Sequence, residues 1–447
     1  MNLEISKQEL KNFLLNANDY DFQEMIEFVH PVDLLSIIHE NDDDAVKILN
    51  RLSDETIAHL LDEEDDEDIY DLLKQFSTNR QKEILEEMSS DEIADFVQTL
   101  DEEESKDILS KMSVEDVAEV KELLSYAPDT AGGIMAKEFI SIRENKTVQK
   151  TLEYLQQVAQ NAEMAYYLYV TDSIGHLKGV VSLRDLVSSP FDTLISEITN
   201  PNVQTVNTND DQEEVAYIID KYDYVMIPVV DNEDIIKGVI TIDDIVDIIK
   251  EEATEDIHHM AGLNAEEKVD GTLIESIKSR LPWLSVNLVT AVLAASVVAM
   301  FSSTIEAVVA LAAINPIIAG MGGNAGTQSL TIIVRGIALG ELTGENAKKV
   351  FFKEFGVGLL TGTILGIVVA IGCYFFFGNP YLGIVAGSAM VFNLVVATVS
   401  GYAVPIILEK MNIDPALASS VFVTTATDVL GFFAFLGLAT MLLPYLI

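Results

Sequence analysis

Apolar pairs recur every twelve residues through the first part of the chain. The pairs are Ile48-Leu49, Leu60-Leu61, Leu72-Leu73, Ile84-Leu85, Phe96-Val97 and Ile108-Leu109, with acidic residues and serines between them. A period of this length suits one short helix and one turn, with the apolar side chains on one helical face. A serine followed by acidic residues, as at Ser113, is typical of a helix N-cap. Residues 1–130 are therefore predicted to form an all-α helical solenoid.

A longer repeat begins after residue 131. The segment 168–187 aligns with 227–246 at a constant offset of 59 residues. Each copy reads as strand, turn, strand and helix, and the runs GVVSL and GVITI are typical of strands buried on both faces. Residues 131–250 resemble a tandem CBS module of α/β fold. In that family the repeated motif ends in an aspartate near a nucleotide ribose, here Asp185 and Asp244; a purely structural or dimerising module is the alternative.

The last third of the chain contains five apolar stretches. They lie near 284–302, 307–334, 355–377, 383–408 and 417–445. Each is long enough to cross a bilayer core of about 30 Å as a helix. Residues 282–447 are therefore predicted to form an all-α five-helix transmembrane domain, which makes the whole chain a multi-domain protein.

Charge separates the same regions. Residues 1–130 carry a net charge of −27, residues 131–270 carry −17, and residues 271–447 carry −1. An acidic body of this kind repels nucleic acid and concentrates cations. Cys373 is the only cysteine, which excludes an intrachain disulfide framework and a multi-cysteine metal site.

The basic residues predict how the membrane part is oriented. The N-terminus has no apolar run, so we expect it to stay in the cytosol. The bases of the membrane part fall between spans two and three and between spans four and five: Arg335, Lys348, Lys349, Lys353 and Lys410. With five spans and a cytosolic N-terminus, all of these bases lie in the cytosol and the C-terminus lies outside.

The stretch GMGGNAGTQS, residues 320–329, interrupts the second apolar segment. Glycines permit unwinding, which a membrane tolerates only beside protein or a watery cavity. Freed carbonyls, that of Gly323 among them, would then offer oxygen ligands to a cation. The side chains that would join them are Asn324, Thr327 and Gln328. The alternative is tight helix packing through the GxxxG pair Gly322 and Gly326.

Asp428 is the only acid well inside a predicted span. A carboxylate there costs several kcal/mol unless water or a cation compensates it, so Asp428 is a candidate functional residue. Asn324 and Asp428 both lie about 15 Å from the cytosolic ends of their spans. The alternative is a protonated Asp428 that is hydrogen-bonded to a neighbouring helix.

Together these features resemble the MgtE family of magnesium transporters and channels over nearly the whole chain. The resemblance rests on the acidic helical N domain, the CBS pair, a connecting helix at 251–281, and five spans with the motifs GGNAGTQ and TDVLGF. It implies a homodimer whose pore lies on the two-fold axis, lined by spans two and five and closed by a cytosolic magnesium sensor. By motif, Asp428 is the pore carboxylate, with Asn324 and Thr424 near it.

The resemblance also implies regulatory sites. The magnesium-sensing acids that it implies are Asp223, Asp244, Asp247, Glu252, Glu255 and Asp256, and the residues that would contact ATP are Arg184, Asp185 and Tyr224. Charge alone supports a sensor, because clustered acids repel one another until bound cations draw the cytosolic parts together and favour a closed pore. For any single acid the alternative is a solvated helix face.

We therefore expect magnesium transport across the cell membrane rather than an enzyme, since the spans hold one Asp and no His. Oxygen ligands suit magnesium, whereas a soft metal would require Cys, Met or His, and all six His precede residue 260. Two alternatives stay open. One is a coupled exchanger or carrier with broader divalent selectivity (Mg, Co, Mn), and the other is a membrane-anchored CBS nucleotide sensor.

Overall fold

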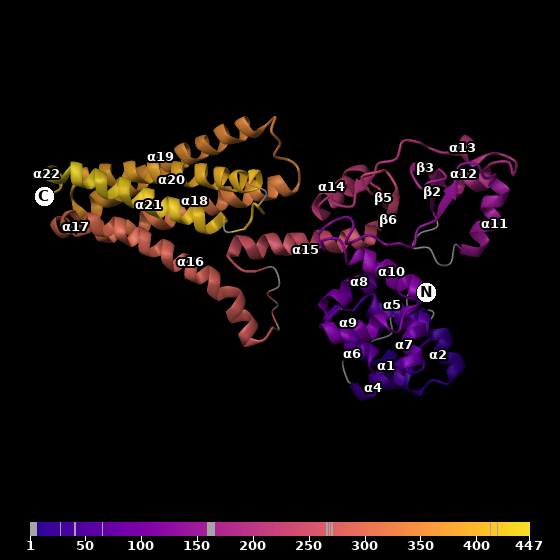
Figure 1. The fold of residues 1–447 in the computed structure, drawn as a ribbon. Coiled ribbons are helices and arrows are strands. Elements are labelled where there is room, and N and C mark those ends of the chain that lie inside the picture. Colours follow the sequence, from indigo (N-terminus) through magenta and orange to yellow (C-terminus); the bar gives the residue numbers. More distant parts are fainter. Residues whose placement is uncertain are drawn as a thin grey trace. The chain divides into compact units, whose positions relative to one another are not determined.

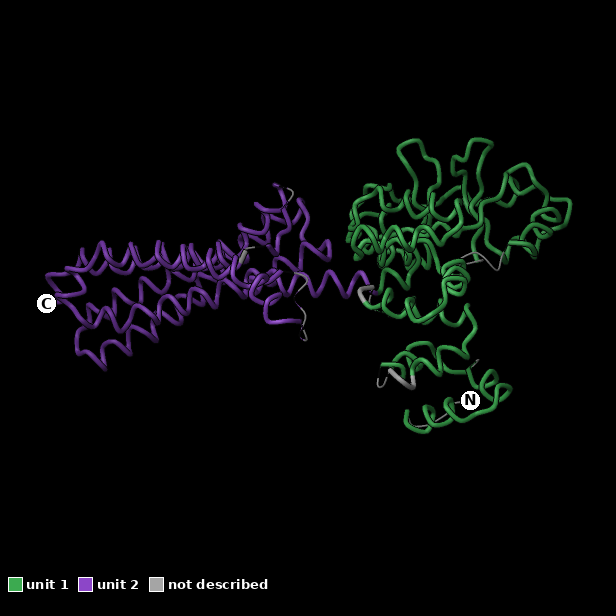
Figure 2. The backbone as a smooth tube through the Cα atoms, turned by 60° about the horizontal axis from the view of Figure 1, so that its bottom comes forward, with its two compact units in different colours: residues 1–246 green, residues 247–447 purple. Residues whose placement is uncertain are grey.

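A computed structural model shows two compact units, residues 1–246 and 247–447. Figure 1 gives the helices and strands, and Figure 2 colours the two units. The structure describes residues 7–26, 28–39, 42–64, 66–158, 166–264, 267, 269, 271–411, 413–417 and 419–447.

The first unit begins with a series of short helices. They are α1 (Lys7–Asn16), α2 (Asp19–Ile26), α3 (Pro31–Ile38), α4 (Asp42–Leu49), α5 (Asp54–Leu61), α6 (Asp66–Leu73), α7 (Thr78–Leu85), α8 (Ser90–Thr99), α9 (Glu102–Leu109) and α10 (Val114–Leu123). From α4 to α10 a helix begins every twelve residues, which confirms the predicted helical repeat.

The apolar pairs form the core of this helical domain. Ile48, Leu60, Ile84 and Phe96 are completely buried. Helices two repeats apart pack together, α5 on α7, α6 on α8 and α8 on α10. The Ser113 hydroxyl accepts a hydrogen bond from the backbone N–H of Asp116, as expected of an N-cap.

Two similar α/β halves complete the first unit. Their elements are β1 (Ser141–Arg143), α11 (Val148–Val158), β2 (Tyr167–Thr171), β3 (Leu177–Ser182), α12 (Leu183–Ser188) and α13 (Ile195–Ile198), followed by β4 (Val206–Asn207), α14 (Gln212–Tyr222), β5 (Met226–Val230), β6 (Ile236–Thr241) and α15 (Ile242–Ala261). The sheets have the order β1-β2-β3 and β4-β5-β6, with the first pair parallel and the second antiparallel. Since β5 and β6 follow β2 and β3 by 59 residues, the predicted repeat is confirmed.

The second unit consists of long helices (Figure 1). They are α16 (Leu273–Met300), α18 (Ala310–Ala338), α19 (Ala347–Phe377), α20 (Pro380–Lys410) and α21 (Ser419–Met441), with the short α17 (Ser302–Ala307) and α22 (Leu443–Leu446). Helix α20 packs against α18, α19 and α21 and is the most buried of them.

Four helices in the described part of the chain are long and apolar enough to cross a membrane: α16, α19, α20 and α21. Helix α18 has 29 residues and one charged side chain, Arg335, so its glycines and polar residues are what lower its hydropathy. The five long helices fit the predicted helical transmembrane domain. The segment 251–281, predicted as a connecting helix, holds the C-terminal half of α15 and the first turns of α16.

Close approach of α19 and α20 depends on glycine. A Cβ atom added at Gly366 would lie 2.7 Å from the carbonyl oxygen of Gly387, and one at Gly383 would lie 2.6 Å from that of Ala370. Neither position has room for a side chain, so the two helices meet backbone to backbone. Because α20 also packs against α18 and α21, it is the central helix of the unit.

Candidate ion path and regulatory acids

Helix α18 runs without interruption through residues 320–329, so the predicted unwinding is wrong. A Cβ atom at Gly322 would lie 2.3 Å from Nδ2 of Asn393, and one at Gly326 would lie 2.5 Å from Cγ1 of Val423. These two glycines therefore serve helix packing, which was the alternative interpretation. Because a regular helix uses its own carbonyls, that of Gly323 is not freed for an ion.

One face of α18 is polar and exposed. Its residues follow the spacing of a single helical face and are Asn324, Thr327, Gln328 and Thr331. The opposite face is buried and consists of Gly322, Gly326, Ser329, Leu330 and Ile333. We call the exposed set, residues 324, 327, 328 and 331, the polar stripe. Pro316 lies inside the same helix, two turns before the stripe.

The neighbouring helix α21 carries the intramembrane carboxylate. Thr424 is exposed and Asp428 is half-buried, and the two are four residues apart, on one face. Helices α18 and α21 pack together, with Val423 against Gly326. Among the described residues, the side chains of Asn324, Gln328, Thr424 and Asp428 form no hydrogen bond or ion pair. Their oxygen atoms are therefore available to water or a cation.

A second acid lies inside a membrane-length helix, which the sequence analysis missed. Glu354 of α19 is 3% exposed. Its carboxylate accepts a hydrogen bond from the Ser329 hydroxyl at 2.5 Å and lies 2.9 Å from the Lys353 ammonium. Asp428 is thus not the only acid in these helices. The third span had been predicted to begin at residue 355, one position too late to include Glu354, whereas α19 begins at Ala347.

A possible ligand group forms in the second unit at the C-terminal half of α15. Glu255, His259 and Asp414 each offer one ligand atom, and these atoms lie within 4.8 Å of one another. Nδ1 of His259 is 3.5 Å from Glu255 Oε1. Burial, together with the charge of Asp414, raises the pKa of the adjacent Asp256 to about 6. Of this group, the resemblance had implied Glu255 and Asp256 but neither His259 nor Asp414.

A cluster of acids forms in the first unit, in which Asp91 is buried and the others are half-buried. Asp91 and Glu92 lie in the first turn of α8, Asp62 ends α5, and Asp244 lies in the first turn of α15. Burial raises the pKa of Asp62, Asp91 and Asp244 to about 6, and that of Glu92 further. In the described part of the chain, Oδ1 of Asp62 and Oδ1 of Asp91 have no hydrogen-bond donor. Carboxylates held in this way favour a cation between them.

Only Asp244 of this cluster was named from the sequence. Its carboxylate accepts a hydrogen bond from the Thr241 hydroxyl at 2.5 Å. Asp91 and Glu92 stand in the same first-turn position as acids of the other repeats, so the pattern alone does not set them apart. The remaining implied sensor acids are more open: Asp247 is exposed and pairs with Lys250 at 2.6 Å, and Glu252 is half-buried.

A cavity of about 290 Å³ lies between the two α/β halves, and Tyr224 and Asp223 line it together with Tyr167 and Tyr169. Asp223 has a left-handed backbone (φ 53°) where α14 ends, which turns the chain toward Tyr224. The ring of Tyr224 stacks on that of Tyr222 at 5.6 Å between centroids. Aromatic walls of this kind suit a flat base.

Arg184 and Asp185 lie at the start of α12 and are exposed. The Asp185 carboxylate accepts a hydrogen bond from the Ser182 hydroxyl at 2.6 Å, as Asp244 does from Thr241. Neither residue is among those that line the cavity of Tyr224. The structure thus places Asp223 beside Tyr224 and leaves Arg184 and Asp185 outside the cavity wall.

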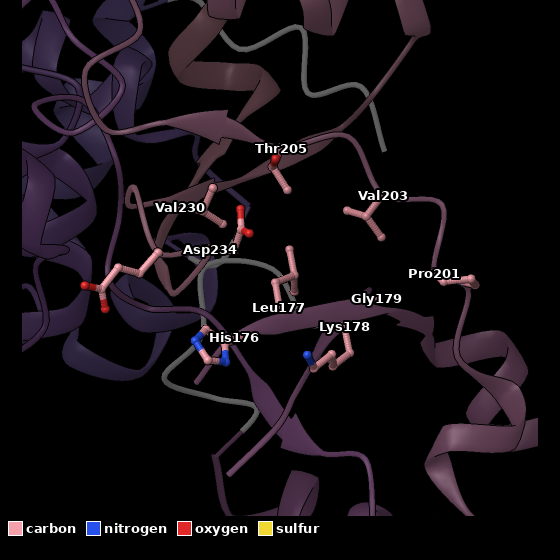
Figure 3. A pocket seen from close by; sticks show the side chains of 10 residues that line it. His176, Leu177, Lys178, Gly179, Pro201, Val203, Thr205, Val230 and Asp234 are labelled. Atoms are coloured by element: carbon pink, nitrogen blue, oxygen red, sulfur yellow. The ribbon is translucent and has the colours of Figure 1, made fainter. Parts of the chain in front are cut away.

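A second cavity, of about 360 Å³, lies on the other side of the segment 200–205 (Figure 3). Its labelled lining includes His176, which precedes β3, together with Lys178 of β3, Thr205 and Asp234. Residues 201 and 205 face this cavity, residues 200, 202 and 204 line the cavity of Tyr224, and Val203 lines both. The linker between the two halves therefore forms a wall of both.

Comparisons with known proteins bear on the whole arrangement. A family model described as a divalent cation transporter, MgtE, matches residues 315–438. The model of the MgtE intracellular N domain matches residues 29–129, and CBS domains match 131–191 and 195–251. The magnesium transporter MgtE of Thermus thermophilus is 40% identical over 326 residues, 72% of each chain. The chain belongs to the MgtE family.

Other members of the MgtE family are similar to the same extent. The magnesium transporter MgtE of Enterococcus faecalis is 39% identical over 73% of this chain and 72% of its own. The crystal structure of the cytosolic domain of the Mg²⁺ channel MgtE in complex with ATP is 36% identical, with a TM-score of 0.51 over 54% of this chain and 100% of that chain. The soluble part of a magnesium transporter is 37% identical, with a TM-score of 0.52 over 56% and 100%. This chain is thus a membrane protein of a magnesium transporter family.

Proposed function

We propose that this protein conducts magnesium ions across the cell membrane along a path lined by α18 and α21 of two identical chains. The observation that carries the proposal is the polar stripe of α18 together with the half-buried Asp428 of α21, a helix that packs against α18. Both lie on helices that are otherwise apolar. In the described part of the chain, the side-chain oxygens of Asn324, Gln328 and Asp428 have no hydrogen-bond partner, whereas the Thr331 hydroxyl donates to the Thr327 carbonyl.

The free-energy cost of exposing polar side chains to lipid argues for a second copy of the chain. An amide or carboxylate that faces hydrocarbon without a partner is unfavourable by several kcal/mol. The stripe must therefore face water or protein, and in a single chain it lies exposed on the surface of the helical unit. Two chains related by a two-fold axis would bring two stripes and two copies of Asp428 around one watery path.

The ligand chemistry suits magnesium. Mg²⁺ releases its waters reluctantly and is commonly held through them by one or two carboxylates. Asp428, Asn324, Gln328 and Thr424 offer one carboxylate and neutral oxygens, which can accept hydrogen bonds from the waters of a hydrated ion. No thiolate or imidazole is present on this face of α18 or α21 to favour a softer metal.

Regulation by magnesium rests on the two groups of acids. In the first unit, the charge of the buried Asp91 helps to raise the pKa of the half-buried Asp244, and neither carboxylate forms an ion pair with a described residue. In the second unit, Glu255 and Asp256 of α15 adjoin Asp414. Magnesium bound at these positions would stabilise a compact cytosolic arrangement and shift the pore toward its closed state. The implied acids Asp223, Asp247 and Glu252 would add to this charge.

The bases at the ends of the long helices support a cytosolic position for both acidic regions. Arg335 ends α18, Lys348 and Lys349 begin α19, and Lys410 ends α20, so all lie at one end of the bundle. By the positive-inside rule this end faces the cytosol, and the C-terminus, at the other end of α21, lies outside.

Adenine nucleotide is the second proposed ligand. The cavity of Tyr224 has aromatic walls, and the ATP-bound relative shares this part of the fold. Tyr224 of the second half would stack against the base, while Arg184 and Asp185 of the first half, outside the cavity wall, would reach the phosphates and the ribose. The nucleotide would then tune the magnesium response and would not be consumed.

Reconstitution tests the transport function. The purified protein is placed in liposomes that contain a magnesium-sensitive dye, and uptake is compared with that of protein-free liposomes. We expect magnesium uptake down its own gradient, with no need for an imposed sodium or proton gradient. Uptake that requires either gradient would show a coupled carrier, and absence of uptake would contradict the proposal.

A further inference from the structure

Asn393 is the polar side chain at the centre of the transmembrane unit. It lies near the middle of α20 and is 0% exposed. Its Nδ2 donates a hydrogen bond to the backbone carbonyl of Ile318 in α18 at 2.9 Å.

Two glycines make the room that Asn393 occupies. A Cβ atom at Gly322 of α18 would lie 2.3 Å from Asn393 Nδ2, and one at Gly431 of α21 would lie 2.5 Å from Asn393 Oδ1. Both distances are far below van der Waals contact, so neither helix could carry even a methyl group there. The Asn393 amide of α20 thus fills the space beside Gly322 in α18 and the space beside Gly431 in α21.

A buried amide in this place is not explained by packing alone. A leucine has the same branched arrangement of side-chain heavy atoms and avoids the cost of burying a polar group, and Oδ1 of Asn393 has no donor among the described residues. The amide specifies the helix register, because its hydrogen bond to one particular carbonyl can form in only one register of α20 against α18. A single buried Asn is known to fix helix register in this way.

The register that Asn393 fixes is the one that places the ion-contacting residues. Gly322 precedes Asn324 by two residues, and Gly431 follows Asp428 by three. Each of these glycines therefore lies within one helical turn of a residue of the proposed path. A slip of α18 or α21 past Asn393 would change the separation between the polar stripe and the carboxylate.

We propose that Asn393 is a positioning residue for ion selection: held between Gly322 and Gly431, it sets α18 against α21 and so sets the distance from Asn324 to Asp428. The inference rests on the proposed function, since it concerns the same path. It assigns selectivity to a side chain that the ion does not touch.

The first test is Asn393→Leu, which keeps the branched shape of the side chain and removes the hydrogen bond. Magnesium and cobalt uptake are measured in liposomes that contain equal amounts of folded protein. We expect the ratio of magnesium to cobalt flux to fall by roughly 3-fold to 30-fold, the range of one interhelical hydrogen bond in a membrane.

The matched control is Thr398→Val. Thr398 lies on the same helix, is 2% exposed and also sits against a glycine, since a Cβ atom at Gly358 would lie 2.3 Å from its Oγ1. That glycine belongs to α19, which carries none of the path residues. A merely structural effect would lower the amount of folded protein in both variants, whereas the flux ratio should change only for Asn393→Leu.

If Asn393→Leu does not fold, a pair of compensating substitutions at Gly322 and Asn393 still tests the inference. Gly322→Ala should abolish flux in the natural background, because its methyl group meets Asn393, and should be tolerated with Asn393→Ala, which vacates that space. Failure of the double variant to recover flux, or an unchanged flux ratio in Asn393→Leu, would overturn the inference. If the natural protein itself carries no magnesium, the proposed function fails instead, and the two results are distinguishable.

Discussion

The imidazole of His259 lies 2.5 Å from the carboxylate of Asp414, across 155 residues of sequence. His259 belongs to α15, next to Glu255 and Asp256, and Asp414 lies in the segment that leads from α20 into α21. The contact therefore joins the helix of the proposed sensor to the connection before the helix of Asp428. A cation bound at Glu255 would act directly on that connection.

This contact predicts the effect of Asp414→Asn. Loss of the carboxylate weakens the link between bound magnesium and α21, so a higher magnesium concentration should be needed to close the path. We expect the half-inhibitory concentration to rise by roughly 5-fold to 150-fold, the range of a typical coupling free energy. Flux is measured against magnesium on the cytosolic side. Glu409→Gln removes an exposed acid from the end of α20 and should leave the concentration unchanged.

Asp428→Asn tests the intramembrane carboxylate. The amide preserves the shape and removes the charge, so magnesium flux should fall by roughly 10-fold to 100-fold, as for loss of a charged hydrogen-bond acceptor. Liposome uptake and the amount of dimer are measured together. Glu306→Gln, an exposed acid of α17, is the control and should transport normally. Natural flux from Asp428→Asn would remove this residue from the mechanism.

Asn324→Ala tests the polar stripe. Because the amide contacts the hydration shell rather than the helix packing, its loss should alter the ratio of magnesium to cobalt flux more than the amount of protein in the membrane. The control is Asn287→Ala, an exposed asparagine of α16. If both variants keep the natural ratio, the stripe has no part in ion selection.

Nucleotide binding is predicted to depend on Tyr224. Removal of a stacking ring typically costs about 1 to 3 kcal/mol, so Tyr224→Ala should weaken ATP binding by roughly 5-fold to 150-fold. Calorimetry on the full chain measures the affinity. Tyr154→Ala removes an exposed tyrosine of α11 that does not line the cavity and should bind as the natural protein does. No heat from ATP, ADP or AMP in the natural protein would favour a structural CBS pair.

The buried acids of the first unit predict a pH dependence in the absence of magnesium. Burial raises the pKa of Asp91 and Asp244 to about 6, above the value of about 4 in an unfolded chain. The folded state therefore binds more protons between pH 4 and 6, and stability should fall as pH rises through that range. Each acid should change the free energy of unfolding by at most about 3 kcal/mol.

Denaturant unfolding of residues 1–246 at pH 5 and pH 7, with a chelator, measures this effect. Asp91→Asn should remove part of the difference, and saturating magnesium should also reduce it, because a bound cation stabilises the ionised carboxylates. A chelated protein that is more stable at pH 7 than at pH 5 would contradict the burial of these acids.

The repeats were predictable from the sequence because they are local. The twelve-residue period fixes which side chains share a helical face, and the 59-residue offset brings Asp185 and Asp244 to equivalent places in two halves. Both follow from spacing along one segment. The stretch 320–329 was misread because glycine permits two outcomes, unwinding or close packing, and only the neighbouring Asn393 decides between them.

The contacts between distant segments were not predictable. Glu354 with Ser329, His259 with Asp414, and Asp91 with Asp244 each join residues that no periodicity relates. Which helices meet depends on how the apolar faces pack, and a single sequence shows the faces without their partners. The candidate-site residues that share one helix were thus predictable from the sequence, whereas the contacts between helices were not.

The twelve-residue period also has a consequence for how the chain comes to be folded. Since α5 packs on α7, α6 on α8 and α8 on α10, each contact of the helical domain closes only a short loop. Low contact order of this kind gives rapid folding that spreads from one repeat to the next. During synthesis these helices can reach their native packing before the first membrane helix leaves the ribosome, so the strongly acidic part is already compact when insertion into the bilayer begins.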